Sequence, residues 1–233
     1  MKTKRKICIG LSIVAVTGLV IFLIWFNFFN YKFSINEDGY LEYSGTAAYI
    51  IVPSEIDGKK VKLYVDSFGE NQFLRVVKIE EGIEEINGFE VCTNLRKVVL
   101  PESARTLQEY AFLSCDKLTS INLEHVEYFE SNSLCSESLI LDHFPQNFQS
   151  DTIEVCAFQV CTMKEIVIPE SVTSIENIAF DNVKTSKVVI PETVINIGDK
   201  LDFRWTNGEN YYVKEGSYAE SWMKENGHTY HLY

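Results

Sequence analysis

The chain has 233 residues, of which 46% are hydrophobic, and it carries a net charge of −12. Of the 21 Lys and Arg residues, four lie in positions 1–6 and 17 follow Tyr31, against 33 Asp and Glu residues, so the chain from Tyr31 has a net charge of about −16. This excess of acid argues against nucleic acid as a partner, because phosphate binding needs a basic surface. It also disfavours adsorption to anionic lipid. We expect the negative charge to keep the protein soluble. The alternative is that the acidic residues, which are densest at Glu80–Glu85, form a face that binds a basic partner or cations.

The N-terminal stretch predicts a membrane anchor. Residues 1–6 are strongly basic, and residues 7–29 form a 23-residue stretch without a charged side chain, long enough for a helix to cross a bilayer. The stretch ends in IFLIWFNFFNY, without the small residues of a cleavage site. We therefore predict a single-pass transmembrane helix at 7–29, with residues 1–6 in the cytoplasm and the remaining chain outside the cell. The alternative is a cleaved leader and a secreted protein.

Residues 30–73 are predicted to form an N-terminal cap with the first strands. Asp57-Gly58 lies between two strand-like runs, which is a hairpin signal. A cap of this kind protects the exposed edge of the first coil of a stack.

Residues 74–205 contain an internal repeat of about 22 residues. The segments KEIVIPESVTSI and SKVVIPETVINI are near-copies one unit apart. Within a unit, alternation of apolar and polar residues predicts a short strand that ends at a proline, because proline cannot donate to a ladder. In the unit from Met163 we expect four buried side chains, at Ile168, Val172, Ile175 and Phe180. Unit starts are predicted at Leu74, Leu95, Leu118, Leu139, Met163 and Thr185.

Two units are irregular. The third is one residue short near Leu123, and the fourth contains two extra residues within Gln149–Thr152. Separate loops can absorb such differences while a shared core stays in register. Irregular segments on a rigid scaffold are also where binding specificity is usually found.

The pattern L-x-x-I-x-I-P-x-x-V-x-x-I-x-x-x-A-F-x-x-C resembles the BspA-type leucine-rich repeat over about residues 51–203. Glu80 and Glu124 depart from it, because proline is usual at both positions. The resemblance implies a β-rich solenoid, a right-handed coil of short strands and turns. It also implies an adhesion-like, non-catalytic role at a bacterial cell surface.

Residues 206–233 are predicted to form a C-terminal cap with one short helix. Ser217 and Glu220 have the spacing of a capping box, and Gly227 should end the helix that follows. The segment GSYAESWMKENG also resembles the closing cap of the same repeat family.

The cysteines outside the predicted anchor are expected to be mostly buried free thiols. Cys92, Cys115 and Cys161 follow the core phenylalanine position of their units by three residues, where a small apolar group would stack. Cys135 and Cys156 lie off this register, so a disulfide involving Cys156 stays open. Zinc is disfavoured, because no C-x-x-C pair occurs.

No motif for catalysis, a cofactor or a metal is present. The sequence lacks G-x-S-x-G, H-E-x-x-H and a phosphate-binding glycine loop, and its four histidines are scattered. We therefore predict that the protein is not an enzyme and uses no cofactor.

Two functions fit these observations. The first is a membrane-tethered module that binds an unknown protein or glycan at the cell surface. The second is a structural spacer, or an accessory ectodomain of a membrane protein assembly. For the first, the irregular fourth unit and the neighbouring bend predict a ligand-facing edge made of Phe148, Gln149, Ser150, Asp151, Thr152, His125 and Tyr128. The alternative is a loop-length difference without function.

Overall fold

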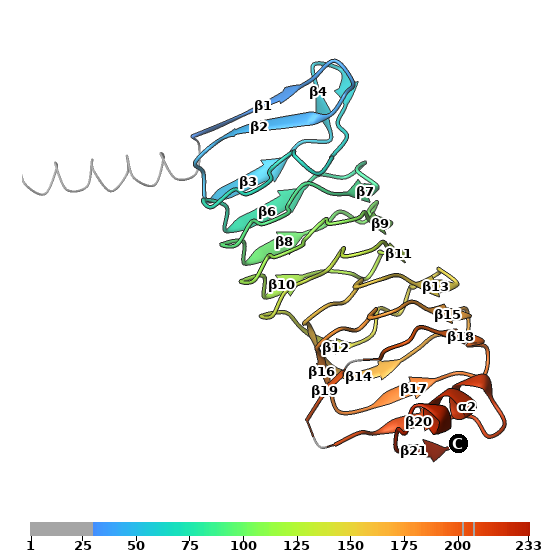
Figure 1. The fold of residues 1–233 in the computed structure, drawn as a ribbon. Helices are drawn as coiled ribbons and strands as arrows, with labels where there is room; N and C mark the ends of the chain where they lie inside the picture. The colour runs from blue at the N-terminus through green and yellow to red at the C-terminus, as the bar shows by residue number, and fades with distance from the viewer. Residues whose placement is uncertain (1–29, 202, 207) are drawn as a thin grey trace, which may run out of the picture.

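The computed structural model describes residues 30–201, 203–206 and 208–233. They form a stack of coils that runs from an N-terminal hairpin to a C-terminal helix (Figure 1). Each repeat unit contributes one strand to a first parallel sheet and a two-residue strand to a second parallel sheet. The β-solenoid expected from the repeat is therefore confirmed.

The first sheet consists of two separate parts. The N-terminal part contains β3 (Tyr49–Val52), β6 (Val76–Ile79), β8 (Lys97–Val99) and β10 (Ser120–Ile121). The C-terminal part contains β12 (Ile140–His143), β14 (Thr162–Val167), β16 (Val183–Thr185), β17 (Val188–Ile190), β19 (Phe203–Trp205), β20 (Tyr211–Val213) and β21 (Tyr230–Leu232). Within β14, Ile166 is buried and Val167 is exposed, which is the alternation expected of a strand with one face on the core.

The second sheet is divided at the same level. Its N-terminal part contains β7 (Glu85–Ile86), β9 (Thr106–Leu107) and β11 (Tyr128–Phe129). Its C-terminal part contains β13 (Thr152–Ile153), β15 (Ser174–Ile175) and β18 (Asn196–Ile197). Both sheets are thus interrupted between the third and fourth repeat units.

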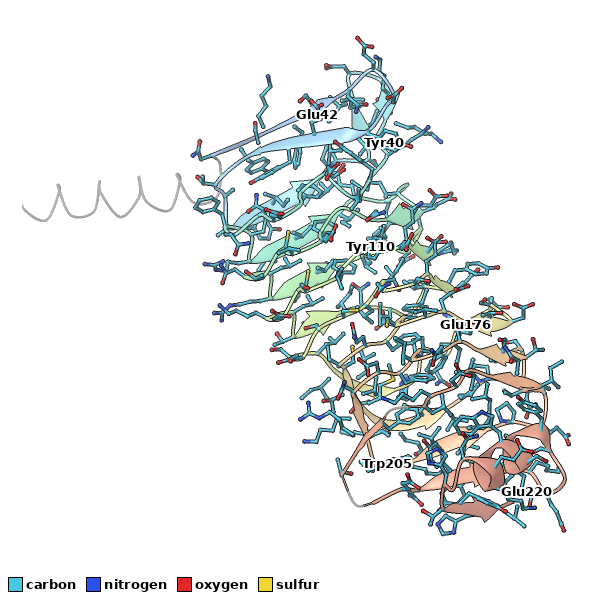
Figure 2. The ribbon with its side chains drawn as sticks, viewed as in Figure 1. Tyr40, Glu42, Tyr110, Glu176, Trp205 and Glu220 are labelled. Atoms are coloured by element: carbon cyan, nitrogen blue, oxygen red, sulfur yellow. The ribbon has the colours of Figure 1, made fainter. Side chains whose placement is uncertain are left out.

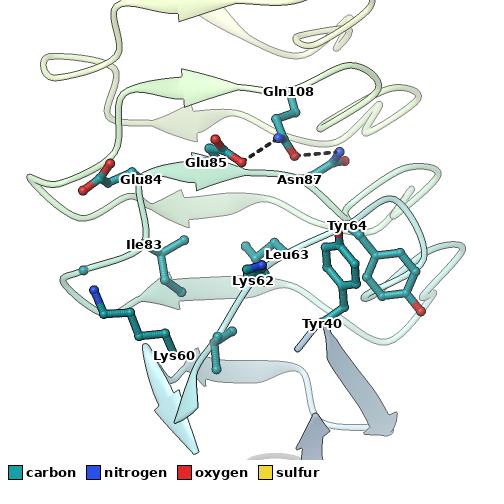
Figure 3. A pocket seen from close by; sticks show the side chains of 12 residues that line it. Tyr40, Lys60, Lys62, Leu63, Tyr64, Ile83, Glu84, Glu85, Asn87 and Gln108 are labelled. Atoms are coloured by element: carbon teal, nitrogen blue, oxygen red, sulfur yellow. Dashed lines mark hydrogen bonds between the residues drawn. The ribbon is translucent and has the colours of Figure 1, made fainter. Parts of the chain in front are cut away.

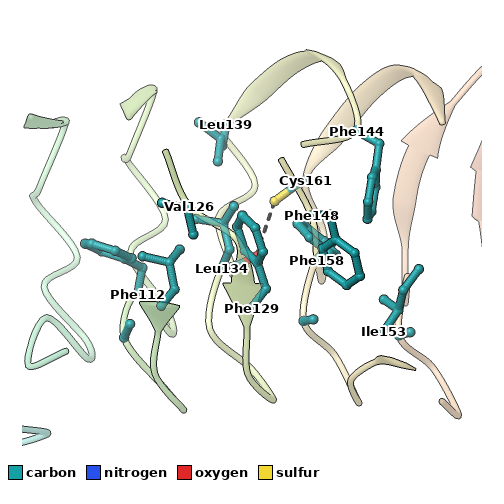
Figure 4. Packing of buried hydrophobic residues seen from close by; sticks show 14 of the residues in the cluster. Phe112, Val126, Phe129, Leu134, Leu139, Phe144, Phe148, Ile153, Phe158 and Cys161 are labelled. Carbon is teal, nitrogen blue, oxygen red and sulfur yellow. Dashed lines mark hydrogen bonds between the residues drawn. The ribbon is translucent and has the colours of Figure 1, made fainter. Parts of the chain in front are cut away.

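A column of aromatic rings forms the centre of the core. The rings of Phe68 and Phe89 are stacked with centroids 4.7 Å apart, and those of Phe89 and Phe112 with centroids 5.4 Å apart. In the third unit Leu134 takes the corresponding place and pairs with Phe112 (Figure 4). The side chains of Ile168, Val172, Ile175 and Phe180 are all buried, as the repeat predicts. Each coil is too thin to bury these groups alone, so the core exists only because the coils stack.

The five described cysteines are free and buried. The thiols of Cys92, Cys115 and Cys161 each donate to a backbone carbonyl of the preceding coil, at Sγ–O distances of 3.5, 3.0 and 3.4 Å. The expectation of free thiols at these positions is confirmed. Cys135 and Cys156, which the sequence leaves open, are free as well.

The N-terminal end of the core is covered by a hairpin. Strands β1 (Tyr31–Ile35) and β2 (Leu41–Gly45) pair antiparallel, and the rings of Phe33 and Tyr43 pack on Phe68. A second hairpin joins β4 (Glu55–Ile56) to β5 (Lys59–Lys60), and both residues of its Asp57-Gly58 turn have positive φ. This agrees with the hairpin signal in the sequence.

The C-terminal end is covered by helix α2 (Tyr218–Glu225). The hydroxyl oxygen of Ser217 accepts a hydrogen bond from the Glu220 amide at 3.1 Å, and the Glu220 carboxylate accepts one from the Gly216 amide at 2.7 Å. Gly227 follows with a φ of 74°, a conformation in which a side chain is disfavoured. The short capped helix is therefore confirmed.

Within the residues that the structure describes, no helix is long and apolar enough to cross a bilayer. The transmembrane segment predicted at 7–29 lies outside those residues and stays a prediction.

Candidate functional site

The most irregular feature of the solenoid is the interruption between the third and fourth units. No register pairing joins β10 to β12, or β11 to β13, although each strand pairs on its other side. The backbones of the two units are hydrogen-bonded mainly on the third side of the coil. There the Asn132 amide donates to the Val155 carbonyl at 3.0 Å, and the Leu134 amide donates to the Ala157 carbonyl at 3.2 Å.

The position of one proline explains the interruption of the first sheet. Strand β12 pairs with β14 so that Leu141 lies opposite Met163, and β13 pairs with β15 at the same spacing of 22 residues. By this register Pro145 lies opposite Val167, two residues ahead of Pro169. Proline ends the ladder early, so β12 stops at His143. Compared with the fifth unit, the fourth unit has two fewer residues up to its proline and two more residues between the proline and β13.

This register corrects one detail of the sequence interpretation. The start of the fourth unit is equivalent to Leu141, not to Leu139, because Leu141 is the residue paired with Met163. The two extra residues within Gln149–Thr152 are therefore balanced by two residues missing before Pro145, and the fourth unit has the same length as the fifth.

A groove of about 370 Å³ lies at the interruption. We call it the mid-stack groove. It is lined by residues of the third unit, of strand β12 and of the turn that follows β12: Ile121, Leu123, Glu124, Leu141, Asp142, His143, Pro145, Gln146 and Asn147.

Apolar side chains at core positions are partly exposed in this groove. Ile121 pairs with Val98, and Leu141 pairs with Met163; both partners are buried, whereas Ile121 and Leu141 are not fully buried. Leu123, at the same register as a buried leucine one coil earlier, is also only partly buried. Separation of the two coils thus leaves part of the solenoid core in contact with solvent.

Polar contacts shape the edges of the mid-stack groove. Beside the groove, the Asn122 side chain accepts from the Leu100 amide at 2.8 Å and donates to the Leu100 carbonyl at 3.0 Å, which ties the third unit to the second. The Asn147 side chain donates to the Glu124 carbonyl and bridges the two units. Gln146 donates to the Phe144 carbonyl at 2.8 Å, which fixes the turn after β12.

The rim of the groove is acidic. Asp142 forms an ion pair with Lys164 from the next coil, and this hydrogen-bonded ammonium holds the pKa of the carboxyl below its ordinary value. Glu124 is exposed on the opposite side. Among the described residues, no group of three His, Cys, Asp or Glu side chains is placed to hold a metal ion.

The two segments predicted as the ligand-facing edge are neighbours. The Gln149 amide donates to the Glu127 carbonyl at 3.0 Å, which joins Phe148–Thr152 to the bend at His125–Tyr128. The side chains of His125, Gln149 and Asp151 are exposed, and that of Tyr128 is 43% exposed. Ser150 and Thr152 are half-buried, with the Ser150 hydroxyl accepting from the Thr152 amide at 3.1 Å.

Phe148 does not fit the predicted role. Its side chain is only 3% exposed, and its ring lies 5.2 Å from that of Phe144 and 6.1 Å from that of Phe129 (Figure 4). Phe148 fills the core of the fourth unit, so its side chain cannot face a ligand. The assignment of Phe148 as a ligand-binding residue was therefore wrong.

The sequence interpretation missed the apolar lining of the mid-stack groove. Nothing in the residue types of Ile121, Leu123 and Leu141 distinguishes them from the buried apolar positions of other units. The signal was present in Glu124 and Pro145, because one unit lacks the usual proline and the next has it two residues early. Their combination predicts strands that cannot pair across the junction.

The fold and the repeat define a leucine-rich repeat solenoid. The model of the BspA type leucine rich repeat region matches six copies, at residues 61–152 and 143–217. Because the match covers more than half of the sequence, the chain belongs to the BspA-type leucine-rich repeat family.

A solved structure shares this fold. A leucine-rich cell surface protein from Faecalibacterium prausnitzii A2-165 is 22% identical with a TM-score of 0.55, and the match covers 73% of this chain and 49% of that one. This chain therefore spans about half the length of that protein. A leucine-rich repeat protein from T. pallidum is 19% identical with a TM-score of 0.43, over 87% and 95% of the two chains. No curated protein matched the sequence.

Proposed function

We propose that this protein is a non-catalytic recognition module at the cell surface, and that its mid-stack groove binds an extended, basic segment of a partner protein. The observation that carries the proposal is the partial exposure of Ile121, Leu123 and Leu141 at positions that are buried elsewhere in the stack. Covering such side chains stabilises a complex by about 25 cal/mol per Å² of apolar surface removed from water.

The backbone favours an extended occupant. Strands β10 and β12 each pair on one side only, so each has an edge toward the groove. A peptide in extended conformation can hydrogen-bond to such an edge while its alternate side chains enter an apolar pocket. The groove offers both features together, at the floor formed by Ile121 and Leu141.

Charge complementarity favours a basic partner. The chain from Tyr31 has a net charge of about −16, and Glu124 adds an exposed carboxylate at the rim of the groove, beside the Asp142–Lys164 ion pair. Opposite charge on a partner segment speeds association and disfavours acidic competitors. We therefore propose apolar side chains flanked by Lys or Arg as the recognised chemistry.

The proposed location is the outer face of the cell membrane. The uncharged stretch at 7–29, preceded by basic residues, supports a single-pass anchor with the repeats outside. The likeness to a leucine-rich cell surface protein agrees with this placement.

A peptide-display selection against the full-length protein in detergent tests the binding proposal. We expect enriched sequences to combine apolar and basic residues, and synthetic copies to bind with micromolar affinity. Leu141→Glu should lower that affinity by at least about tenfold, because it places a charge on the apolar floor.

Ile140→Glu is the matched control for this experiment. Ile140 is the neighbouring residue of β12 but is 63% exposed on the other face of the strand, so the same change of charge should leave affinity within about twofold. Circular dichroism confirms that both variants are folded. Equal affinities of Leu141→Glu and wild type would reject the groove as the site. Failure of the selection to enrich any binding sequence would favour the spacer function.

A further inference from the structure

A second cavity, of about 530 Å³, lies near the N-terminal end of the stack, where Tyr40 is labelled in Figure 2. We call it the N-terminal cavity. Its functional side chains are Tyr40, Lys62, Tyr64, Glu85, Asn87 and Gln108 (Figure 3). They come from the capping hairpin and from three successive coils, so the cavity forms only in the folded stack.

Backbone pairing explains why the cavity is open. The Lys62 carbonyl accepts from the Leu41 amide at 2.9 Å, and the Lys62 amide donates to the Gly39 carbonyl at 3.3 Å. This segment therefore pairs with the capping hairpin. Strand β7 in the next coil remains the edge strand of the second sheet. The space between Lys62 and β7 is the cavity.

One wall is aromatic. The rings of Tyr40 and Tyr64 lie with centroids 5.1 Å apart and planes at 46°, and the Lys62 ammonium lies 5.9 Å from the Tyr40 ring centre. Both tyrosines are half-buried, so part of each ring stays accessible. Figure 3 shows the two rings side by side at one end of the cavity.

A second wall is made of planar polar groups. Gln108 Nε2 donates to Glu85 Oε2 at 2.9 Å, and Asn87 Nδ2 donates to Gln108 Oε1 at 3.3 Å (Figure 3). Asn87 is itself fixed, because its Oδ1 accepts from the Gly88 amide at 2.7 Å. Each amide nitrogen has a second hydrogen, and the carboxylate has a second oxygen. The wall therefore holds donors and acceptors in a fixed arrangement.

We propose that the N-terminal cavity binds a neutral oligosaccharide. A hexose has an apolar face of C–H bonds, which packs on an aromatic ring, and an edge of neighbouring hydroxyls, each of which donates and accepts. The Tyr40–Tyr64 wall matches the first feature and the Glu85–Asn87–Gln108 wall matches the second. The volume falls within the range of about 300–1,000 Å³ that is typical of ligand sites.

The lining disfavours other ligand classes. A wholly apolar ligand would strip water from Glu85 and Asn87 without replacing its hydrogen bonds, which costs free energy. Lys60 and Lys62 balance the charge of Glu84 and Glu85 in the lining, so an anionic or a cationic ligand gains no net attraction to offset the loss of its hydration. A neutral ligand rich in hydroxyl groups avoids all of these costs.

The cavity is separate from the mid-stack groove, and no residue lines both. The oligosaccharide proposal therefore does not depend on the proposed peptide binding, and either can fail alone.

The test uses the full-length protein in a detergent without sugar groups. The probes are maltotetraose, N-acetylated chitotetraose and, as the anionic comparison, tetragalacturonate. Isothermal titration gives affinities, and saturation-transfer NMR shows which sugar protons contact the protein. We expect at least one neutral probe to bind more tightly than about 10 mM, and the anionic probe to bind at least about tenfold more weakly than that neutral probe.

Two variants and a control locate the site. Tyr64→Ala should weaken binding about tenfold, because it removes a stacking ring. Glu85→Gln keeps the shape of the side chain and should weaken binding several-fold, which keeps the proposal testable if Tyr64→Ala fails to fold. Tyr110→Ala changes an exposed tyrosine that lines neither cavity and should bind as wild type.

Two outcomes would overturn the proposal. One is that no neutral probe binds more tightly than about 10 mM. The other is that Glu85→Gln and, if it folds, Tyr64→Ala bind the sugar as tightly as wild type, which would place the sugar elsewhere.

Discussion

The rings of Phe158 and Phe180 lie one above the other in successive coils, with centroids 5.9 Å apart and planes at 15°. On its other side Phe180 stacks on Phe203 with centroids 5.2 Å apart. The Phe180 side chain therefore packs against rings from the coil on each side and contributes to the core of three coils. Loss of such a ring leaves a cavity that rigid neighbouring strands cannot fill.

We expect Phe180→Ala to lower the free energy of unfolding by about 3–5 kcal/mol, the usual cost of truncating a buried aromatic residue. Urea denaturation followed by circular dichroism measures the change. Val167→Ala is the control, because Val167 is 48% exposed and should change stability little. An unaltered midpoint for Phe180→Ala would show that the ring does not support the core.

The buried thiols predict a loss of stability at high pH. Burial raises the pKa of Cys92, Cys135 and Cys161 from 9.0 to about 12. The folded protein therefore keeps protons that the unfolded chain releases. The stabilisation is complete below about pH 9 and is lost as pH rises toward 12, with a slope of about 1.4 kcal/mol per pH unit for each thiol.

The unfolding free energy measured between pH 8 and pH 11 checks this expectation. Cys161→Ala should make the dependence of the unfolding free energy on pH less steep by the contribution of one thiol. This holds whatever the effect of the substitution on stability at pH 8. Identical slopes for the variant and the wild type would mean that Cys161 ionises as easily in the folded state as in the unfolded chain.

A branched residue in a left-handed conformation offers a stabilising substitution. Val160 has a φ of 55°, and Asn182, one coil later at the same position, has a φ of 57°. Asparagine tolerates this region, whereas a β-branched side chain does not. Val160→Asn should raise the free energy of unfolding by about 0.5–1 kcal/mol, and Asn182→Val should lower it by about 1 kcal/mol.

Thermal or urea unfolding of both variants tests the opposite signs. Val160→Ala serves as the comparison, because alanine shortens the side chain but keeps most of the left-handed cost. If Val160→Asn proves less stable than wild type, packing by Val160 outweighs its backbone strain.

The predicted anchor can be tested chemically. The stretch at 7–29 lacks charge and a cleavage site, so we expect the protein extracted from membranes to retain its N-terminal residues. Edman sequencing or intact-mass analysis distinguishes this from a leader removed near Asn30. A mature chain that starts there would make the protein secreted.

The sequence predicts the stacked core well, because each coil requires apolar residues at the same positions of its repeat unit. Ile175 is buried for the same reason as Ile86 and Ile153, so an apolar residue at a fixed spacing is a reliable indicator. Residues 30–73, predicted as a cap with the first strands, also contain β3, which pairs in parallel with β6. The two caps are predictable from local signals such as Ser217 and Asp57-Gly58.

The candidate sites are predicted poorly, because they depend on how neighbouring coils meet. The extra residues near Gln149 are visible in the sequence, but loop length does not reveal that the Phe148 side chain is buried. The mid-stack groove requires the register of β12 against β14. The N-terminal cavity requires the pairing of Lys62 with the capping hairpin. Neither relationship is local in sequence.

The break in both sheets divides the stack into two blocks that touch mainly through the core and a few backbone bonds such as Asn132 to Val155. In a linear array, cooperativity is carried by the contacts between nearest neighbours. The interface between the third and fourth units, which leaves Leu141 partly exposed, is therefore expected to couple the unfolding of neighbouring coils least strongly. A pulling force applied to the two ends of the solenoid should separate the two blocks at this interface first. Each block would then unfold as a separate cooperative unit.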